Sequence, residues 1–394
     1  MKQRNVMLKS AIAVALGLGS AAANATNGDQ MLGVTATQWG MAGAVTAAPQ
    51  DAGTVLTNPA GLAVIEMDEF RSDMGFGFLN PPRTANGNKS DSDLYMMPSG
   101  AIAFRINNRL TAGMGMAGLS GMGVDFSDVN PTPGSGNQAV VTTKQFYKIA
   151  PGFAYQVNDK LSLGAALNID YQSLAISNPD MQLPQNQVFG FGATFGAIYK
   201  INPVLQLGFS YVSEQNMDAF KWNVVSDLDD PTAPPGGVYE MTMDAPAQYS
   251  LGLAWTPSDT LLIEADIKQI MFSDVLNKVD LKTPGGTNTM EFGWDDQTVY
   301  AIAVQKQVNE KTTVRMGYNY GASPIEAEDV ANNIGSLAVT EKHLTLGLTR
   351  QLSKKFSGSL SYAKAFENKV EHDVSPAYIE LEQNVFNLQL TYKN

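Results

Sequence analysis

The chain has 394 residues, a formal net charge of -12 at pH 7 and no cysteine. This acidic balance argues against nucleic acid as a partner, because nucleic-acid binding depends on basic patches that neutralise phosphates. Without cysteine no disulfide scaffold can form, so stability must come from hydrogen-bonded backbone and buried surface. Charged residues make up only 16% of the chain and 36 residues are glycine. This composition favours a membrane β-barrel and leaves a soluble secreted protein as the alternative.

Residues 1–25 have the pattern of a secretory signal peptide. They begin with three basic residues, continue with the apolar run "AIAVALGLGS" and end with the cleavage pattern Ala23-Asn24-Ala25. The run is too short to span a bilayer, and no later stretch is long and apolar enough for a membrane helix. We therefore expect an exported protein whose mature chain begins at Thr26. Loss of the three basic residues would change its net charge from -12 to -15.

Residues 26–66 form the next predicted unit, which contains the segment "QWGMAGAVTAAPQDAGTVLTNPAGLAVIE". This segment is small, apolar and glycine-rich, and it lacks the alternation of polar and apolar residues seen later. Its small residues allow close backbone packing, and Asn58-Pro59 suits a fixed turn better than a strand. If the rest of the chain is a barrel, this unit is predicted to be a hatch, or plug, in the lumen. The alternative is a disordered linker, which its few charges disfavour.

Residues 67–394 carry strand patterns joined by connections of two kinds. Six are short, polar and turn-forming, and seven are longer and less patterned. Thirteen connections imply fourteen strands, and short turns on one side with long loops on the other are typical of an outer-membrane barrel. The short turns are "INNR", "VNDK", "INPV", "TPSD", "VNEK" and "LSKK", and the loops lie near 81–92, 127–142, 177–187, 221–243, 272–290, 321–340 and 367–379.

Alternation within the strands assigns their faces. In "LSLGAALNIDYQ" one set of side chains is apolar and is expected to face lipid: Leu161, Leu163, Ala165, Leu167, Ile169 and Tyr171. The other set faces the lumen: Ser162, Gly164, Asn168, Asp170 and Gln172. A soluble barrel or sandwich could also bury an apolar face, but with fourteen strands this set is too large for one interior. The lumen is also expected to receive six ionisable residues, most of them solvated or mutually paired: Arg105, Glu264, Asp266, Lys268, Arg315 and His343.

The stretch "GMAGAVTAAPQDAGTVLTNPAGLA" resembles the N-terminal signature of the long-chain fatty-acid and hydrophobic-compound transporter family of Gram-negative outer membranes (FadL/TodX-like). Later matches, such as "MPSGAIAFRINNRLTAGMGM", extend the resemblance over nearly the whole mature chain. It implies a fourteen-stranded barrel closed by an N-terminal hatch. It also implies passive transport of long-chain fatty acids or aromatic and aliphatic hydrocarbons. The positions on the hatch signature are Gly40, Gly43, Asn58, Pro59, Ala60, Gly61 and Leu62.

The resemblance also implies a route, and the sequence offers candidate residues along it. Substrate is captured on the extracellular side, the hatch rearranges, and substrate leaves sideways at a kink in the third strand. The matching stretch "GMAGLSGMGVDF" holds Gly115, Gly118, Gly121 and Gly123, which permit a bend but could also merely adjust barrel curvature. The apolar capture candidates are Met181, Leu183, Val188 and Phe189, and the candidate partners of a substrate carboxylate are Arg315 and Arg105.

Other functions remain as alternatives. A general porin for small polar solutes is the strongest, followed by a structural barrel or adhesin. An outer-membrane enzyme fits poorly, because the chain has two histidines, His343 and His372, and no G-x-S-x-G elbow or metal-binding histidine pair. No cofactor or metal is implied. We expect a monomer that contacts outer-membrane lipid and lipopolysaccharide and is inserted by the barrel-assembly machinery. The family often ends in an aromatic residue, whereas this chain ends Tyr392-Lys393-Asn394.

Overall fold

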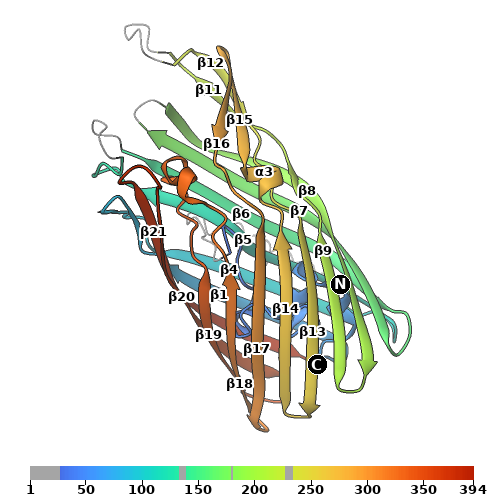
Figure 1. Cartoon of the computed structure of the whole chain (residues 1–394). Coiled ribbons are helices and arrows are strands. Elements are labelled where there is room, and N and C mark those ends of the chain that lie inside the picture. Colours follow the sequence, from blue (N-terminus) through green and yellow to red (C-terminus); the bar gives the residue numbers. More distant parts are fainter. Residues whose placement is uncertain (1–26, 133–138, 179–180, 227–233) are drawn as a thin grey trace.

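The computed structural model describes residues 27–132, 139–178, 181–226 and 234–394. Within these ranges one antiparallel sheet closes into a fourteen-stranded barrel (Figure 1), which confirms the predicted fold. The signal peptide predicted at 1–25 lies outside the described residues. The barrel strands are β1 (Phe70–Asn80), β4 (Tyr95–Arg105), β5 (Leu110–Asp125), β6 (Val141–Gln156), β7 (Leu161–Asn178), β8 (Met181–Asn202), β9 (Leu205–Val212), β13 (Gln248–Ser258), β14 (Leu261–Ile270), β17 (Gln297–Asn309), β18 (Thr312–Gly321), β19 (Lys342–Gln351), β20 (Phe356–Glu371) and β21 (Tyr378–Lys393).

Each barrel strand pairs with its neighbour in the chain, and β21 pairs with β1 from Arg71↔Lys393 to Asn80↔Asn384 to close the ring. All six predicted short turns connect strands at the same end, which we term the short-turn side. At the opposite, long-loop side, the prediction of a loop at 177–187 is wrong. There β7 and β8 continue as a paired hairpin as far as Asn178↔Met181. They extend because apolar side chains such as Leu174 and Leu183 are buried on their inner face.

The predicted faces of the strands are confirmed. Along β7, Leu163 and Leu167 are about half exposed on the outer surface, at 45% and 51%, whereas Asn168 and Asp170 are buried inside. The same alternation holds on β18, where Met316 points outward. A continuous apolar outer surface is what the hydrocarbon of a bilayer requires of a barrel. No helix in the described part of the chain is long and apolar enough to cross a membrane.

The long-loop side carries structure that the sequence patterns did not predict. A separate four-stranded sheet projects beyond the barrel (Figure 1), and apolar residues such as Phe220, Trp222 and Leu281 are buried between it and the barrel end. The elements of this sheet are β11 (Phe220–Val224), β12 (Gly237–Met241), β15 (Lys278–Thr283) and β16 (Gly286–Glu291). The other short elements on this side are β2 (Arg83–Ala85), β3 (Asn88–Lys89), β10 (Asn216–Met217), α3 (Ser273–Leu276) and η3 (Ala327–Asn333).

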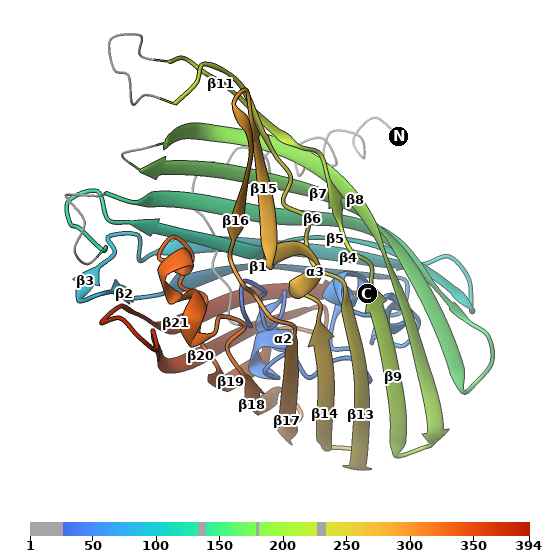
Figure 2. The same cartoon turned by 45° about the horizontal axis from the view of Figure 1, so that its top comes forward.

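Residues 27–67, which we call the hatch, lie inside the barrel (Figure 2). It contains α2 (Ala36–Gly40) and two short 3-10 helices, η1 (Ala52–Leu56) and η2 (Pro59–Ala63). Each begins at a polar residue whose side chain accepts a backbone N–H: Thr35, Asp51 and Asn58, respectively. These caps satisfy backbone donors that would otherwise be buried without partners.

Glycines on the inner wall allow the hatch to approach the strands. A Cβ on Gly347 would lie 3.0 Å from the Cα of Gly40 in α2. A Cβ on Gly164 of β7 would overlap the backbone of Pro59 and Ala60 in η2. These wall positions accommodate backbone of the hatch where any side chain would collide with it.

We predict that Gly164→Ala displaces η2 from the wall, because overpacking of a buried contact costs about 1–3 kcal/mol. The displaced hatch should let ions through, so single channels in planar bilayers should conduct where the wild type is sealed. Gly358→Ala is the matched control, because its Cβ would meet no atom closer than 3.7 Å. A folded Gly164→Ala barrel that stays sealed would contradict this view of the hatch.

Candidate functional site

Two acidic residues of the wall hold one edge of the hatch. Glu264 and Asp266 project inward from β14 and are buried. Asp266 Oδ2 accepts the backbone N–H of Val45 at 3.0 Å and of Thr46 at 2.9 Å. Glu264 Oε1 accepts the next two N–H groups, from Ala47 at 2.7 Å and residue 48 at 2.9 Å. Four successive donors are thus satisfied by two carboxylates, which fixes residues 45–48 against the wall.

A second polar cluster ties η1 to the seam where β1 meets β21. Arg71 Nε lies 2.8 Å from Asp73 Oδ2, and the same carboxylate oxygen accepts the N–H of Ala52 at 2.9 Å. Asp51, the N-cap of η1, accepts a hydrogen bond from Thr35 Oγ1 at 2.6 Å. Burial raises the pKa of the Asp51 carboxyl above its usual value, and the neighbouring Asp73 carboxylate raises it further. The β1–β21 seam, where the barrel closes, is therefore also a place where the hatch is attached to the wall.

The predicted hatch motif, Asn58 to Leu62, forms a compact turn at the wall. Asn58 Oδ1 accepts the N–H of Ala60 at 3.2 Å, while its Nδ2 donates to Thr46 O at 2.7 Å. Pro59 occupies the first helical position, where its missing N–H costs nothing. Leu62 is fully buried. Asn58 thus joins η2 to the segment that Glu264 and Asp266 hold. Of the two hatch glycines, Gly43 has φ +79, a conformation that other residues rarely adopt, and Gly40 contacts β19.

The hydrogen bonding of the wall is interrupted between β4 and β5. Pairing runs from Arg105↔Thr111 to Ser99↔Ala117 and then stops, although β5 continues to pair with β6 as far as residue 125. A β-bulge lies at Leu119, between Gly118 and Ser120. There the hatch replaces β4 as a partner, since Met31 N donates to Leu119 O at 3.0 Å and Gln30 bridges Ser120.

The four glycines predicted for a kink fall on both sides of this interruption. Gly115 is still paired with β4, and its missing side chain makes room for Val55 and Leu56 of the hatch. Gly118 borders the bulge. Gly121 and Gly123 lie on the part of β5 that pairs with β6 alone.

An apolar cavity of about 730 Å³ lies on the long-loop side of the hatch. Of the predicted capture residues, Met181 lines it, and Leu183 and Val188 are buried in the neighbouring apolar core. Phe189 was wrongly placed, because it points outward from β8 and is 55% exposed. It alternates with the inward-facing Val188, and a strand cannot turn both inward. The cavity also has methionines that the sequence patterns did not single out: Met122, Met241, Met243 and Met290.

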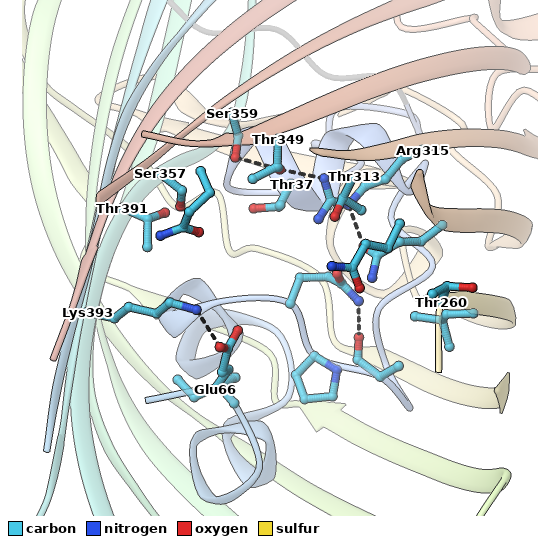
Figure 3. Close-up of a pocket in the computed structure, with 18 of the residues that line it drawn as sticks. Thr37, Glu66, Thr260, Thr313, Arg315, Thr349, Ser357, Ser359, Thr391 and Lys393 are labelled. Atoms are coloured by element: carbon cyan, nitrogen blue, oxygen red, sulfur yellow. Dashed lines mark hydrogen bonds and ion pairs between the residues drawn. The ribbon is translucent and has the colours of Figure 1, made fainter. Parts of the chain in front are cut away.

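A second, polar cavity of about 540 Å³ lies on the short-turn side of the hatch (Figure 3). Arg315 lines it and donates to Gln305 Oε1 at 2.6 Å and to Thr349 Oγ1 at 2.7 Å. Lys393 there pairs with Glu66 of the hatch at 2.5 Å. Arg105 lies elsewhere, at the end of β4, where it donates to the carbonyl groups of residues 67 and 68. The two arginines are thus not brought together, and neither lines the apolar cavity.

Of the other ionisable residues expected in the lumen, Lys268 lines a small cavity of about 70 Å³ between hatch and wall. His343 is buried on the inner face of β19.

Solved structures of known proteins match the fold. Among solved structures, a FadL homologue of Pseudomonas aeruginosa superposes with a TM-score of 0.73 at 17% identity, covering 93% of this chain and 99% of that chain. The toluene transporter TbuX of Ralstonia pickettii gives 0.72 at 17%, covering 91% and 98%. The toluene transporter TodX of Pseudomonas putida gives 0.71 at 16%, covering 94% and 100%. At such identities the likeness establishes the fold.

No curated protein matches the sequence. A family model does, described as outer membrane protein transport protein (OMPP1/FadL/TodX), and it covers residues 17–374. Because this match spans most of the chain, the protein belongs to the OMPP1/FadL/TodX family of outer-membrane transport proteins.

Proposed function

We propose that this protein carries apolar small molecules, either long-chain fatty acids or hydrocarbons, passively across the outer membrane. The observation that carries the proposal is the apolar, methionine-rich cavity between the long loops and the hatch. Methionine side chains are flexible and polarisable, so they adapt to apolar ligands of different shape. Burying each methylene group contributes about 0.8 kcal/mol, so a long alkyl chain needs only partial burial to bind.

Rearrangement of the hatch is the second part of the proposal. The hatch fills the lumen between the two large cavities, so a bound molecule can advance only if part of it moves. Asn58 is a suitable pivot, because it connects η2 to residues 45–48 through Thr46. Outer membranes lack ATP, and so the movement must be driven by binding and by the downhill concentration of the substrate.

Lateral release through the wall is the third part. Between β4 and β5 the ladder of hydrogen bonds is interrupted, and hatch residues 30 and 31 bond to the bulge instead. If these two residues withdrew, β5 would lose the partners that replace β4 here, and the wall would be easier to open. An apolar molecule could then pass into the bilayer without entering the polar cavity. Exit through the wall requires lipid beside it, and we therefore propose a monomer.

A general porin is the remaining alternative among channels. A porin needs an open polar lumen, whereas this lumen holds a hatch fixed by buried hydrogen bonds to β14 and to the β1–β21 seam. The expected contacts with lipopolysaccharide and with the assembly machinery, and the candidate carboxylate partners Arg315 and Arg105, stay predictions.

We predict that cells lacking this protein regain uptake of radiolabelled oleate, toluene or both when it is restored. Changing both Asn58 and Pro59 to alanine should reduce that uptake at equal amounts of folded, inserted barrel, because the turn loses its cap and its bond to Thr46. Ion conductance in planar bilayers by the wild type, with no uptake of either compound, would instead identify a porin.

Deletion of Leu119 tests lateral release separately. Removing the extra residue of the bulge should make the pairing of β5 with β6 regular and straighten β5, so that β5 can stay beside β4 and narrow the interruption. We expect severalfold slower uptake, with binding of the substrate to purified protein unchanged. Uptake at the wild-type rate by a folded deletion variant would place the exit elsewhere.

A further inference from the structure

Lys144 is the one charged residue that lines the apolar cavity, among the residues that the structure describes. It projects inward from β6, and its side chain is only 5% exposed. Further along the same inner face, Phe146 and Lys148 line the small cavity beneath. Lys144 therefore stands at the hatch end of the proposed capture site, where the ligand path meets the hatch.

The partner of Lys144 belongs to the hatch. Lys144 Nζ lies 2.9 Å from Asp29 Oδ2, and the Asp29 side chain is 1% exposed. The same carboxylate accepts hydrogen bonds from Ser120 Oγ at 2.6 Å and from Gln30 Nε2 at 2.6 Å. Ser120 is part of the bulge in β5. Asp29 of the hatch is therefore bonded both to the cavity lysine on β6 and to the interrupted strand β5.

Residues 27–31 form a latch on that strand. Asn27 and Gln30 exchange two backbone hydrogen bonds of 2.9 and 3.0 Å, which close a tight turn around Asp29. Gln30 forms an isolated antiparallel β-bridge with Ser120, and Met31 N donates to Leu119 O. The only buried ion pair between hatch and wall in the described residues is the one made by Asp29. The latch is thus held by this ion pair together with the backbone contacts of Gln30 and Met31, and the lysine of the pair lines the cavity.

We propose that Lys144 is the residue that recognises an anionic head group, and that a bound carboxylate replaces Asp29 as its partner and releases the latch from β5. This inference rests on the proposed function and deepens it, because it names amphiphilic acids as the substrates that open the wall. Asp29 occupies the position beside Lys144 Nζ that the substrate carboxylate would take, so the two carboxylates compete for the same ammonium group.

The charge balance at Lys144 makes the exchange of carboxylates selective for acids over neutral hydrocarbons. A carboxylate arriving beside Lys144 places two negative groups on one ammonium in a buried site, and their repulsion favours the departure of one of them. The substrate is held by burial of its alkyl tail in the cavity as well as by the ammonium, so Asp29 is the group that leaves. When Asp29 leaves, Gln30 and Met31 leave the bulge with it, because they belong to the same tight turn. A neutral hydrocarbon fills the cavity but cannot compete for the ammonium, so it leaves the latch closed.

Two ligands with the same tail and different head groups test this inference. ω-Bromoundecanoate and ω-bromoundecanol both quench tryptophan, and Trp222 and Trp294 lie in the apolar cluster that surrounds the cavity. The readout is the ratio of the acid Kd to the alcohol Kd for purified protein in detergent. We expect Lys144→Gln to raise this ratio about tenfold, because a hydrogen-bonded charge pair is lost. Asp29→Asn should lower the ratio, because the internal competitor loses its charge.

The variants control for folding and for charge. The double variant Lys144→Gln with Asp29→Asn leaves no unpaired buried charge, so it should fold and show the same raised ratio. Lys364→Gln breaks the ion pair of Lys364 with Glu382 in the β20–β21 wall, 2.6 Å long, and should leave the ratio unchanged. A wild-type ratio in the double variant would overturn the proposal. Absence of quenching by both ligands in the wild type would instead overturn the proposed function, and this inference with it.

Hydrogen exchange tests the release of the latch. The Met31 amide, which is bonded to Leu119 O, should exchange at least tenfold faster with the acid bound and stay protected with the alcohol bound. Equal protection with both ligands would overturn the coupling of head group to latch.

Discussion

The width of the lumen is the constraint from which the rest of the structure follows. A fourteen-stranded ring is too wide for its own inward side chains to fill. The hatch supplies the missing volume, and it can do so only because the wall has glycine where the hatch backbone approaches, as at Gly164 and Gly347. The glycines that admit the hatch also weaken the strands that carry them. Wall and hatch therefore stabilise each other, and neither surface is suited to being exposed.

The bonds that hold the hatch differ in how they respond to a ligand. Glu264 and Asp266 bind backbone N–H groups of residues 45–48, which carry no net charge and lie away from the apolar cavity. Asp29 is bound instead by a lysine that lines this cavity. An arriving head group can compete for the second kind of contact but not for the first. The proposed exchange would therefore loosen the hatch only at residues 27–31, with the remainder still attached to the wall.

Periodic features were predictable from the sequence, and packing between distant segments was not. Strand number, faces and short turns follow from alternation and turn residues, which act over a few positions. The hatch followed from the small residues around Asn58 and from the family resemblance. The sheet of β11, β12, β15 and β16 was missed because its strands are short and are stabilised by the barrel end. Phe189 was misplaced because apolar character alone does not distinguish lipid from cavity. Lys144 was missed because its partner, Asp29, lies 115 positions away.

The contrast between the two large cavities favours an exit through the wall. On the long-loop side the lining is rich in methionine, whereas on the short-turn side it consists largely of threonine, serine, glutamine and charged residues. An alkyl chain that moved from the first cavity into the second would forfeit about 0.8 kcal/mol for each methylene it exposed to a polar, hydrated lining. The hydrocarbon of the bilayer imposes no such cost. The interruption between β4 and β5 lies at Leu119, which packs against both the apolar cluster of the long-loop side and the apolar core of the hatch. On the proposed exit route, an apolar molecule passing Leu119 would therefore keep apolar contacts at the point where it leaves the cavity.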